Sequence, residues 1–476
     1  MPFVMAPRDR GALAIVLHTH MPYVEGFGTW PFGEEWLWEA MAVSYLPLLD
    51  LLQAGAPLTV SMTPVLADQL AAPIGERFED FLRGVRRDTH AADAADLRAE
   101  GEEALAVEIE RAAGDYEWAL ARFGSIDGDL LGALAPFLAW TSSATHAVLP
   151  LLATEAGLRL QVQSGLRAHR ARISEDWRGG FWLPECAHAT WLHETLADAG
   201  VHATCIELTD RLGLGSIAQL TPIATESGLT LVPLDRATID LVWGGRGYPS
   251  RPAYRDTHRR TRNWYHAWAN SGEAYDHEAA LAAARDDARD FVARVRARLL
   301  AAERELPDGG LLVCGLDTEL LGHWWYEGVA WLGAVVEEAE RQEVALTHLD
   351  DALARHPGRP AAAGELDGVC SWGSDRTLST WDGPAVAELA WAIRGAELEA
   401  VAAGRRLDRA GMRQLLALQS SDWAFLVSRD LAAAYGRERV EAHLAGLRAS
   451  LREESPGEEP LRELARHVDT AALLAP

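Results

Sequence analysis

Lysine is absent from this chain of 476 residues, so arginine supplies all 44 basic side chains. Without lysine, the protein has no Schiff-base nucleophile and no P-loop lysine for binding phosphate. The formal net charge is −26, and such an acidic chain has no excess of cations to neutralise nucleic-acid phosphates or an anionic membrane surface. These absences predict no nucleic-acid and no membrane partner, and they favour a neutral substrate.

Cysteine is also scarce, and the sequence has no long apolar run. The cysteines Cys186, Cys205, Cys314 and Cys370 are scattered and form no CxxC pair, which is typical of a reducing compartment rather than of a disulfide framework. The N-terminus has no apolar core of signal-peptide length, and the run at 12–17 is too short to span a bilayer. We therefore expect a cytoplasmic protein.

Tryptophan, in contrast, is abundant, with 18 residues against 10 phenylalanines. Its side chain combines a flat apolar face with a hydrogen-bond donor at the edge. Sugar rings present apolar C–H faces bordered by hydroxyl groups, so a cleft rich in tryptophan suits a carbohydrate. Each single tryptophan is equally consistent with a place in the core.

The hydrophobic pattern predicts an α/β fold with a parallel sheet. Short apolar segments typical of buried strands alternate with helical patterns at 76–122, 141–170, 277–304 and 327–342. The strand candidates are 12–18, 57–63, 179–185, 202–207, 229–235 and 309–317. Because polar residues repeatedly follow these strands, we expect a barrel whose site lies at the C-terminal ends of the strands.

The amino-acid composition of the sequence changes near residue 356, where a Pro/Gly/Ala-rich stretch begins. We predict a catalytic barrel over 1–355, with helical insertions at about 76–135 and 208–275. A connector at 356–383 carries a substrate-contacting loop, and an α-helical C-terminal domain spans 384–476.

Two carboxylates stand directly at predicted strand ends. Glu185 follows the strand candidate 179–185, and Asp317 closes the strand candidate 309–317. Cleavage of a glycosidic bond needs one carboxylate as nucleophile or base and a second as proton donor, and two strand ends of one barrel can bring such a pair together. An ordinary loop carboxylate is the alternative for each residue alone.

Histidines and tryptophans accompany these carboxylates. His18 and His20 share a face at the end of the first strand, which favours a role in the site over a structural one. His323 follows Asp317 in a turn with two tryptophans, and His146 is expected at the start of a helix. The loop with Trp372 and Trp381 is as consistent with a linker as with a site.

Two other classes of protein fit part of this pattern. A metal-dependent amidohydrolase or deacetylase would use His18, His20, His146 and Asp317 as ligands of a divalent cation. The missing lysine, which could not form a carbamylated bridge, and the many tryptophans argue against it. A non-catalytic glucan-binding protein would be expected to lack one of the two carboxylates, and both are present.

Six motifs, in the same order along almost the whole chain, resemble glycoside hydrolase family 57, and specifically its branching-enzyme-like members. These motifs are HTHMPY (18–23), ATHAVLPLL (144–152), FWLPECAH (181–188), LDTELLGHWW (316–325), SWGSDRTLSTW (371–381) and QSSDW (419–423). The resemblance implies a distorted (β/α)7 barrel followed by an α-helical C-terminal domain. It also implies a retaining double displacement without a metal or organic cofactor.

Residue by residue, the resemblance matches Glu185 to the nucleophile and Asp317 to the general acid/base. His18, His20 and His146 match the histidines that surround the scissile sugar. The remaining expected contacts to an α-glucan are His323, Asp422, Trp182, Trp372, Trp381, Trp423, Trp30 and Trp264.

The resemblance favours 1,4-α-glucan branching, in which an α-1,4 bond is cleaved and the chain is transferred to a 6-hydroxyl. Branching members usually carry a loop with a tyrosine soon after the nucleophile strand, whereas 210–229 here is short and has no tyrosine. Hydrolysis and 4-α-glucanotransfer therefore stay open as alternative activities. The sequence does not determine the chain-length preference or the oligomeric state.

Overall fold

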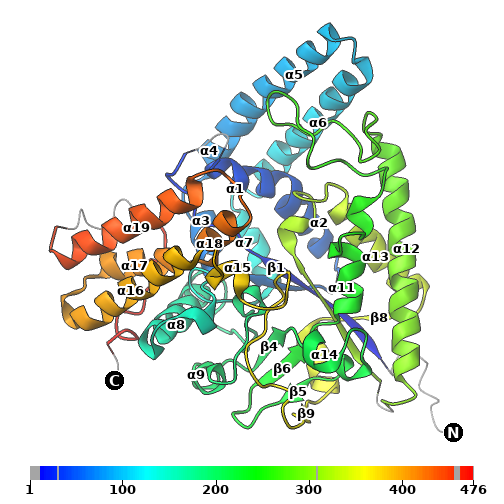
Figure 1. The fold of residues 1–476 in the computed structure, drawn as a ribbon. Helices are drawn as coiled ribbons and strands as arrows, with labels where there is room; N and C mark the ends of the chain where they lie inside the picture. The colour runs from blue at the N-terminus through cyan, green and yellow to red at the C-terminus, as the bar shows by residue number, and fades with distance from the viewer. Residues whose placement is uncertain (1–10, 29–31, 307–308, 455–460, 475–476) are drawn as a thin grey trace.

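A computed structural model of the chain describes residues 11–28, 32–306, 309–454 and 461–474. Its strands lie at the centre, helices α5 and α6 project as a pair, and the C-terminal helices lie together on one side (Figure 1). The strands are β1 Ala12–Thr19, β2 Thr59–Met62, β3 Leu138–Trp140, β4 Ala203–Ile206, β5 Ile223–Ala224, β6 Thr230–Pro233, β7 Leu311–Asp317, β8 Ala345–Leu346 and β9 Arg359–Pro360.

The helices before residue 383 surround and extend this set of strands. They are α1 Glu34–Ala40, α2 Leu46–Gln53, α3 Pro64–Leu70, α4 Gly75–Asp80, α5 Arg87–Ala99, α6 Glu103–Ser125, α7 Leu130–Leu134, α8 Glu155–Arg172, α9 Leu192–Asp198, α10 Thr209–Leu212, α11 Arg236–Trp243, α12 His277–Ala302, α13 Gly328–Arg341, α14 Leu349–Arg355 and α15 Ser379–Asp382. The C-terminal helices are α16 Ala387–Ala403, α17 Arg409–Leu418, α18 Ser421–Ser428 and α19 Tyr435–Leu451.

The strands close into a ring. Strand β1 pairs in parallel with β2 and with β7, β2 pairs with β3, and β4 pairs with β6. Two parallel bridges, Thr141 to Phe181 and Gly180 to Ala203, join β3 to β4 through residues 180–181. The amide of Asp235, just after β6, donates to the carbonyl of Val313 in β7 (2.9 Å). This closure confirms the predicted distorted (β/α)7 barrel.

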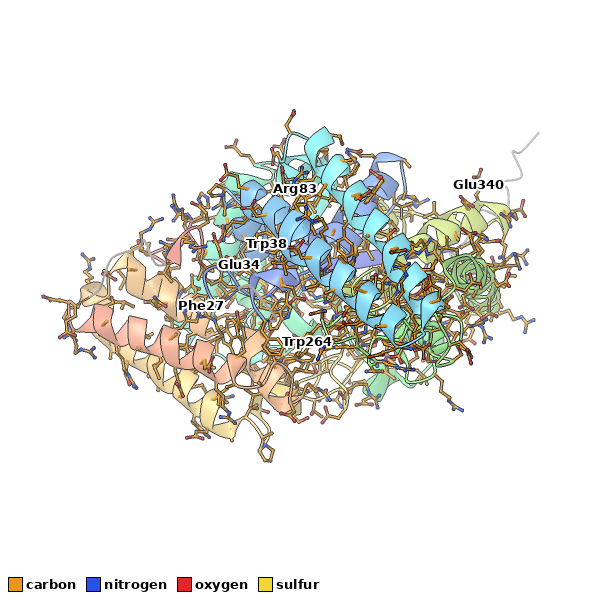
Figure 2. The ribbon with its side chains drawn as sticks, turned by 90° about the horizontal axis from the view of Figure 1, so that it is seen from above. Phe27, Glu34, Trp38, Arg83, Trp264 and Glu340 are labelled. Carbon is orange, nitrogen blue, oxygen red and sulfur yellow. The ribbon has the colours of Figure 1, made fainter. Side chains whose placement is uncertain are left out.

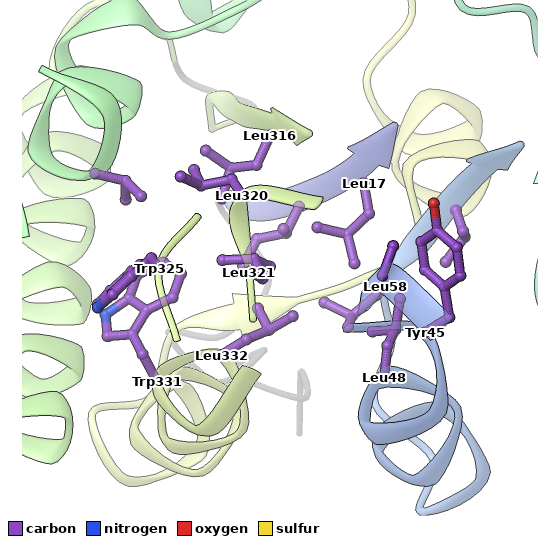
Figure 3. Close-up of a cluster of buried hydrophobic side chains, with 14 of the residues drawn as sticks. Leu17, Tyr45, Leu48, Leu58, Leu316, Leu320, Leu321, Trp325, Trp331 and Leu332 are labelled. Atoms are coloured by element: carbon purple, nitrogen blue, oxygen red, sulfur yellow. The ribbon is translucent and has the colours of Figure 1, made fainter. Parts of the chain in front are cut away.

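The core of the barrel is formed by aliphatic strands covered on both faces. All eight residues of β1 are buried, as expected for a central parallel strand. Leu17 of β1 and Leu316 of β7 belong to the same buried cluster as Trp331 of α13 (Figure 3). Because strands and helices share this core, the ends of the strands are held rigidly.

The register of the strands brings their polar residues to one end of the barrel. His18 of β1 lies opposite both Ser61 of β2 and Asp317 of β7. The following residues continue into loops at the same end. The predicted placement of polar groups at the C-terminal ends of the strands is therefore correct for His18 and Asp317, and Ser61 lies beside them.

Two sequence-based expectations need correction. Residues 179–185 form no regular strand, because only Gly180 and Phe181 make bridges before the turn at Pro184. The helix expected over 141–170 begins only at Glu155. Residues 141–154 form a loop and a short 3-10 turn, so His146 lies in that loop and not at a helix start.

The two expected insertions differ. Residues 75–134 are helical apart from short turns, and they include the projecting pair α5 and α6. Residues 208–275, however, contain β5 and β6, and β6 is part of the barrel ring. The description of 208–275 as a helical insertion is therefore wrong for its middle part.

The C-terminal helices pack on the barrel through an apolar core of their own. Leu415 of α17 and Leu447 of α19 share this core with Val65 of α3 and Leu160 of α8. The exact domain boundaries at 355 and 384 stay a prediction. In the part of the chain that the structure describes, no helix is long and apolar enough to cross a membrane.

Candidate active site

Three histidines and a tryptophan stack at the C-terminal end of the barrel. The ring centroid of His18 lies 4.9 Å from that of Trp182 and 5.0 Å from that of His146. His20 lies 3.9 Å from His146, again with nearly parallel rings. The three histidines predicted for the site are thus brought together, although His146 is 128 residues from His18 in sequence.

The backbone places Glu185 and His146 by unusual turns. Glu185 has φ 61° and ψ 20°, and Cys186 and His146 also have positive φ. Residues other than glycine seldom adopt this left-handed conformation, and it is concentrated at functional sites. The turn after Pro184 aims the Glu185 carboxylate toward the histidines.

The Glu185 carboxylate is held by two hydrogen-bond donors. The indole Nε1 of Trp372 donates to its Oε2 (3.1 Å), and the hydroxyl of Ser421 lies 3.2 Å from its Oε1. Burial raises the pKa of Glu185 to about 7, whereas the bonds from Trp372 and Ser421 lower it. Both donors favour the ionised form.

Asp317 has a different environment. Among the described residues, no group is hydrogen-bonded to its carboxylate. Burial raises the pKa of Asp317 well above its usual value, and the nearby charges of Glu319 and Glu185 raise it further. The neutral acid is therefore the favoured form of Asp317 when Glu185 is ionised.

His20 is the cation of the cluster. Its Nε2 lies 2.9 Å from Oδ1 of Asp422, and its Nδ1 lies 3.1 Å from the hydroxyl of Thr63. Burial alone would lower the pKa of His20, but the charge and hydrogen bond of Asp422 raise it overall, with help from Glu319 and Glu185. Asp422, predicted for the site, therefore reaches it from the C-terminal helices.

Changing Asp422 to asparagine is expected to lower the pKa of His20, because the ring loses the charge and the charged hydrogen-bond acceptor that raise its pKa, while the burial that lowers it remains. Histidine NMR titrations of the wild type and Asp422→Asn measure this shift, with His20→Gln identifying the signal. A His20 pKa that is the same in Asp422→Asn as in the wild type would show that Glu319 and Glu185 are sufficient to charge the ring.

His18 and His146 are, in contrast, neutral. Burial lowers the pKa of both rings well below the usual value, and the charge of His20 lowers it further. Their Nε2 atoms lie 2.9 Å apart. His18 Nδ1 contacts the Ser61 hydroxyl (3.3 Å), and His146 Nδ1 contacts that of Ser421 (2.8 Å). All four ring nitrogens are thus engaged within the protein.

The tryptophans predicted to contact the glucan differ in how far they are exposed and in what they contact. Trp372 is partly exposed and touches Glu185. Trp182 is fully buried behind His18 and Trp372, and Trp423 is fully buried with its Nε1 donating to the carbonyl of Ala417 (2.8 Å). The structure therefore presents neither Trp182 nor Trp423 to a ligand, and both act as packing supports of the site.

Trp381 is almost fully buried, but it lines a cavity of about 50 Å³ beside Ser420 and Ser421. Its Nε1 is a buried donor without a hydrogen-bond partner among the described residues. The Nε1 of Trp182, behind His18, is likewise a buried donor without such a partner, so two of the predicted tryptophans have an unpaired indole N–H next to the site.

Trp264 and His323 lie farther out. Trp264 is 41% exposed, has positive φ and contacts Phe32 edge-on (Figure 2 labels Trp264). His323 is half-buried and contacts Trp324 (5.3 Å between centroids). No interaction joins either residue to Glu185 or Asp317 in the described chain. Trp30 lies outside the described residues.

Sequence reasoning missed several supporting groups. Ser61 and Thr63 hold the two strand-end histidines, and Tyr45 donates to Oε1 of Glu319 (2.6 Å), which in turn accepts from the His20 amide. Ser61 and Thr63 alternate at the end of a predicted strand and could have been found. Nothing in the helical pattern around Tyr45 marks it.

The site can perform acid–base and nucleophilic chemistry with its own side chains. It contains one carboxylate with two hydrogen-bond donors that favour its anion and a second that favours its proton, and the charge of Glu185 raises the pKa of Asp317. Within the described residues, no group of three histidine, cysteine, aspartate or glutamate side chains is arranged to hold a metal ion.

Family models match two parts of the chain. Residues 139–362 match the model of glycosyl hydrolase family 57. Residues 386–470 match the model described as the C-terminal part of 1,4-alpha-glucan branching enzyme. The second match covers α16, α17, α18 and α19, and so includes the segment with Ser421 and Asp422.

Whole-chain relatives agree with these matches. The 1,4-alpha-glucan branching enzyme of Thermococcus kodakarensis is 31% identical over 91% of this chain and 72% of its own length. A probable 1,4-alpha-glucan branching enzyme of Mycobacterium tuberculosis is 30% identical over 91% of this chain and 90% of its own.

Solved structures show the same fold. The branching enzyme of Pyrococcus horikoshii superposes with a TM-score of 0.86 at 30% identity, covering 98% of this chain and 97% of its own. An α-amylase of Thermotoga maritima superposes with a TM-score of 0.78 at 23% identity, covering 98% and 99%. The latter similarity concerns the fold alone.

Proposed function

Because the chain belongs to glycosyl hydrolase family 57, we propose that it is a 1,4-α-glucan branching enzyme that works by retaining double displacement. Its substrate would be a neutral α-glucan, in keeping with the acidic net charge of −26. The two relatives described above, at 31% and 30% identity, are a branching enzyme and a probable branching enzyme by name, and this favours branching over the hydrolase and metal-dependent alternatives.

One observation supports the roles of the two carboxylates. Glu185 receives two hydrogen bonds that stabilise its anion, whereas Asp317 receives none in the described chain and has its pKa raised by neighbouring carboxylates. A nucleophile must be ionised and a general acid must carry a proton. This contrast supports the proposed roles of Glu185 as the nucleophile and Asp317 as the acid.

In the first step, Glu185 attacks the anomeric carbon while Asp317 protonates the oxygen of the departing chain. The positive charge of the transition state develops beside the Glu185 carboxylate, which stabilises it. The product is a covalent glucosyl-enzyme. The rings of Trp182, His18 and His146, stacked in this order, brace this part of the site and maintain the position of Glu185.

In the second step, Asp317 is ionised and removes the proton of the acceptor hydroxyl. Glu185 leaves as the new bond forms, and the configuration of the sugar is retained. Branching requires a glucan 6-hydroxyl to reach the intermediate before water does.

Because the segment 210–229 is short and has no tyrosine, other groups would have to exclude water from the intermediate. The short segment at 210–229 is attached to the connector, since Arg211 Nη2 donates to the carbonyl of Asp367 (2.7 Å) and Arg376 Nε to Asp210 (2.6 Å). We propose that the connector, with Trp372 and Trp381, and the C-terminal helices enclose the intermediate. These parts, together with the barrel, would form one catalytic unit acting in the cytoplasm.

Incubation with amylose is expected to produce new α-1,6 linkages in excess over new reducing ends. Linkage analysis by NMR and a reducing-end assay measure the two products, and Glu185→Gln protein serves as the background control. Mainly new reducing ends would instead make the enzyme a hydrolase. Redistribution of α-1,4 chain lengths without branches would make it a 4-α-glucanotransferase.

A further inference from the structure

Ser421 is the first residue of α18, and it connects the C-terminal helices to the nucleophile. Its amide donates to the carbonyl of His146 (3.1 Å), and its side chain is buried. Its hydroxyl lies 3.2 Å from Glu185 Oε1 and 2.8 Å from His146 Nδ1. The hydroxyl has one hydrogen, so it can donate to only one of these two acceptors.

The direction of this hydroxyl depends on the two neutral histidines. The Nε2 atoms of His18 and His146 lie 2.9 Å apart and share one hydrogen. If His18 carries it, His146 has its hydrogen on Nδ1 and donates to Ser421. The Ser421 hydrogen is then free to point at Glu185. If His146 carries the hydrogen on Nε2, its bare Nδ1 accepts from Ser421, and Glu185 loses the donor.

The charge of Glu185 selects between these arrangements. An ionised Oε1 facing the lone pairs of Ser421 would be repelled, whereas a hydrogen bond to a carboxylate is stronger than one to a neutral imidazole. The ionised nucleophile therefore favours the first arrangement, in which His18, His146 and Ser421 donate in one direction toward it.

On this basis we propose that Ser421 is a further catalytic residue, a hydroxyl donor to the nucleophile Glu185 whose direction is set by His146 and His18. The proposal rests on the proposed function of Glu185. The donor keeps Glu185 ionised before attack, and it stabilises the carboxylate again when Glu185 leaves the intermediate. The two arrangements contain the same number of hydrogens and differ only in where these hydrogens lie. No bond between heavy atoms forms or breaks except those of the double displacement.

Other charged groups also face Glu185, and they define the background against which Ser421 acts. Asp422 raises the pKa of Glu185 and His20 lowers it, and the Asp317 carboxyl is coupled to it. His146 Nδ1 lies 3.9 Å from Glu185 Oε1. Trp372 donates from the connector to the other carboxylate oxygen. None of these groups is removed when Ser421 is replaced.

The test compares Ser421→Ala with Ser421→Thr, which keeps the hydroxyl. The cavity of about 50 Å³ beside Ser421 leaves room for the added methyl group. Ser428→Ala is the matched control, because Ser428 is at the other end of α18 and its hydroxyl bonds to the carbonyl of Phe425 (3.0 Å). The first readout is the pH profile of kcat/KM on amylose. The second is the titration of Glu185 by ¹³C NMR of labelled glutamate, in which the Glu185 signal is identified by its absence from the spectrum of Glu185→Gln.

In Ser421→Ala, the acidic limb of the profile and the NMR pKa of Glu185 are expected to rise together by about one unit. In Ser421→Thr, the Glu185 pKa is expected to rise by at most about a third of that shift. In Ser428→Ala, it is expected to equal the wild-type pKa. An unchanged Glu185 pKa in Ser421→Ala would overturn the proposal. Wild-type protein without activity on amylose would instead contradict the proposed function, and the NMR titration would still test the Ser421 donor.

Discussion

Glu185→Gln protein is expected to cleave amylose about 10⁴-fold more slowly than the wild type, or slower still. The amide cannot attack the anomeric carbon, so no covalent intermediate forms. The fold should remain intact, because glutamine can accept from Trp372 and donate to Ser421 in the same places as the carboxylate. Initial rates of branching and of reducing-end release, together with thermal unfolding, measure both expectations.

Glu338→Gln is the matched control for this substitution. Glu338 is another buried glutamate, but it lies on α13 and pairs with Arg341 (2.6 Å). It is expected to retain activity within a few-fold of the wild type. Glu185→Ala should, with azide and an activated glucosyl donor, form a glucosyl azide of inverted configuration. Activity of Glu185→Gln within tenfold of the wild type would rule out Glu185 as the nucleophile.

The central strands could be predicted because their apolar runs are continuous. β1 and β7 lie side by side and are buried on both faces, so their sequences alternate very little and end in a polar residue. The same reasoning failed for 179–185 and 141–154. There, turns at Pro184 and Pro150 interrupt the strand or helix, and single bridges replace regular pairing.

Asp317, the proposed general acid, and the strand-end histidine His18 could be placed from sequence for the same reason, since parallel strands bring their C-terminal ends together. Glu185 reaches the same end of the barrel, but from a turn after single bridges and not from a regular strand. The contacts from the C-terminal helices could not. Ser421 and Asp422 lie 236 and 402 residues from their partners Glu185 and His20. Which face of α18 meets the barrel depends on how the apolar side chains around Trp423 pack, and this is a tertiary property.

The tryptophan excess was only partly a sign of a carbohydrate site. Trp182 and Trp423 fill the space behind His18 and beneath α18, where a large planar side chain supports the functional groups in front of it. Composition cannot separate such supports from ligand platforms, because both need the same flat, apolar ring with one polar edge.

Asp317→Asn protein is expected to lose about 10³–10⁴-fold of its activity on amylose, because the departing sugar oxygen is a poor leaving group without a proton. A donor with fluoride as the leaving group needs no such proton, so its first step should remain fast. The second step lacks its base. The glucosyl-enzyme is therefore expected to accumulate, and intact-protein and peptide mass spectrometry should find the added glucan on Glu185.

The pH dependence of the same variant separates this role from a structural one. The wild-type kcat/KM should rise with pH as Glu185, with a pKa of about 7, becomes ionised, and fall at higher pH as Asp317 loses its proton. In Asp317→Asn the alkaline limb should disappear. An adduct on Asp317 in Glu185→Gln protein would reverse the two assignments, and an unchanged alkaline limb in Asp317→Asn would place the general acid elsewhere.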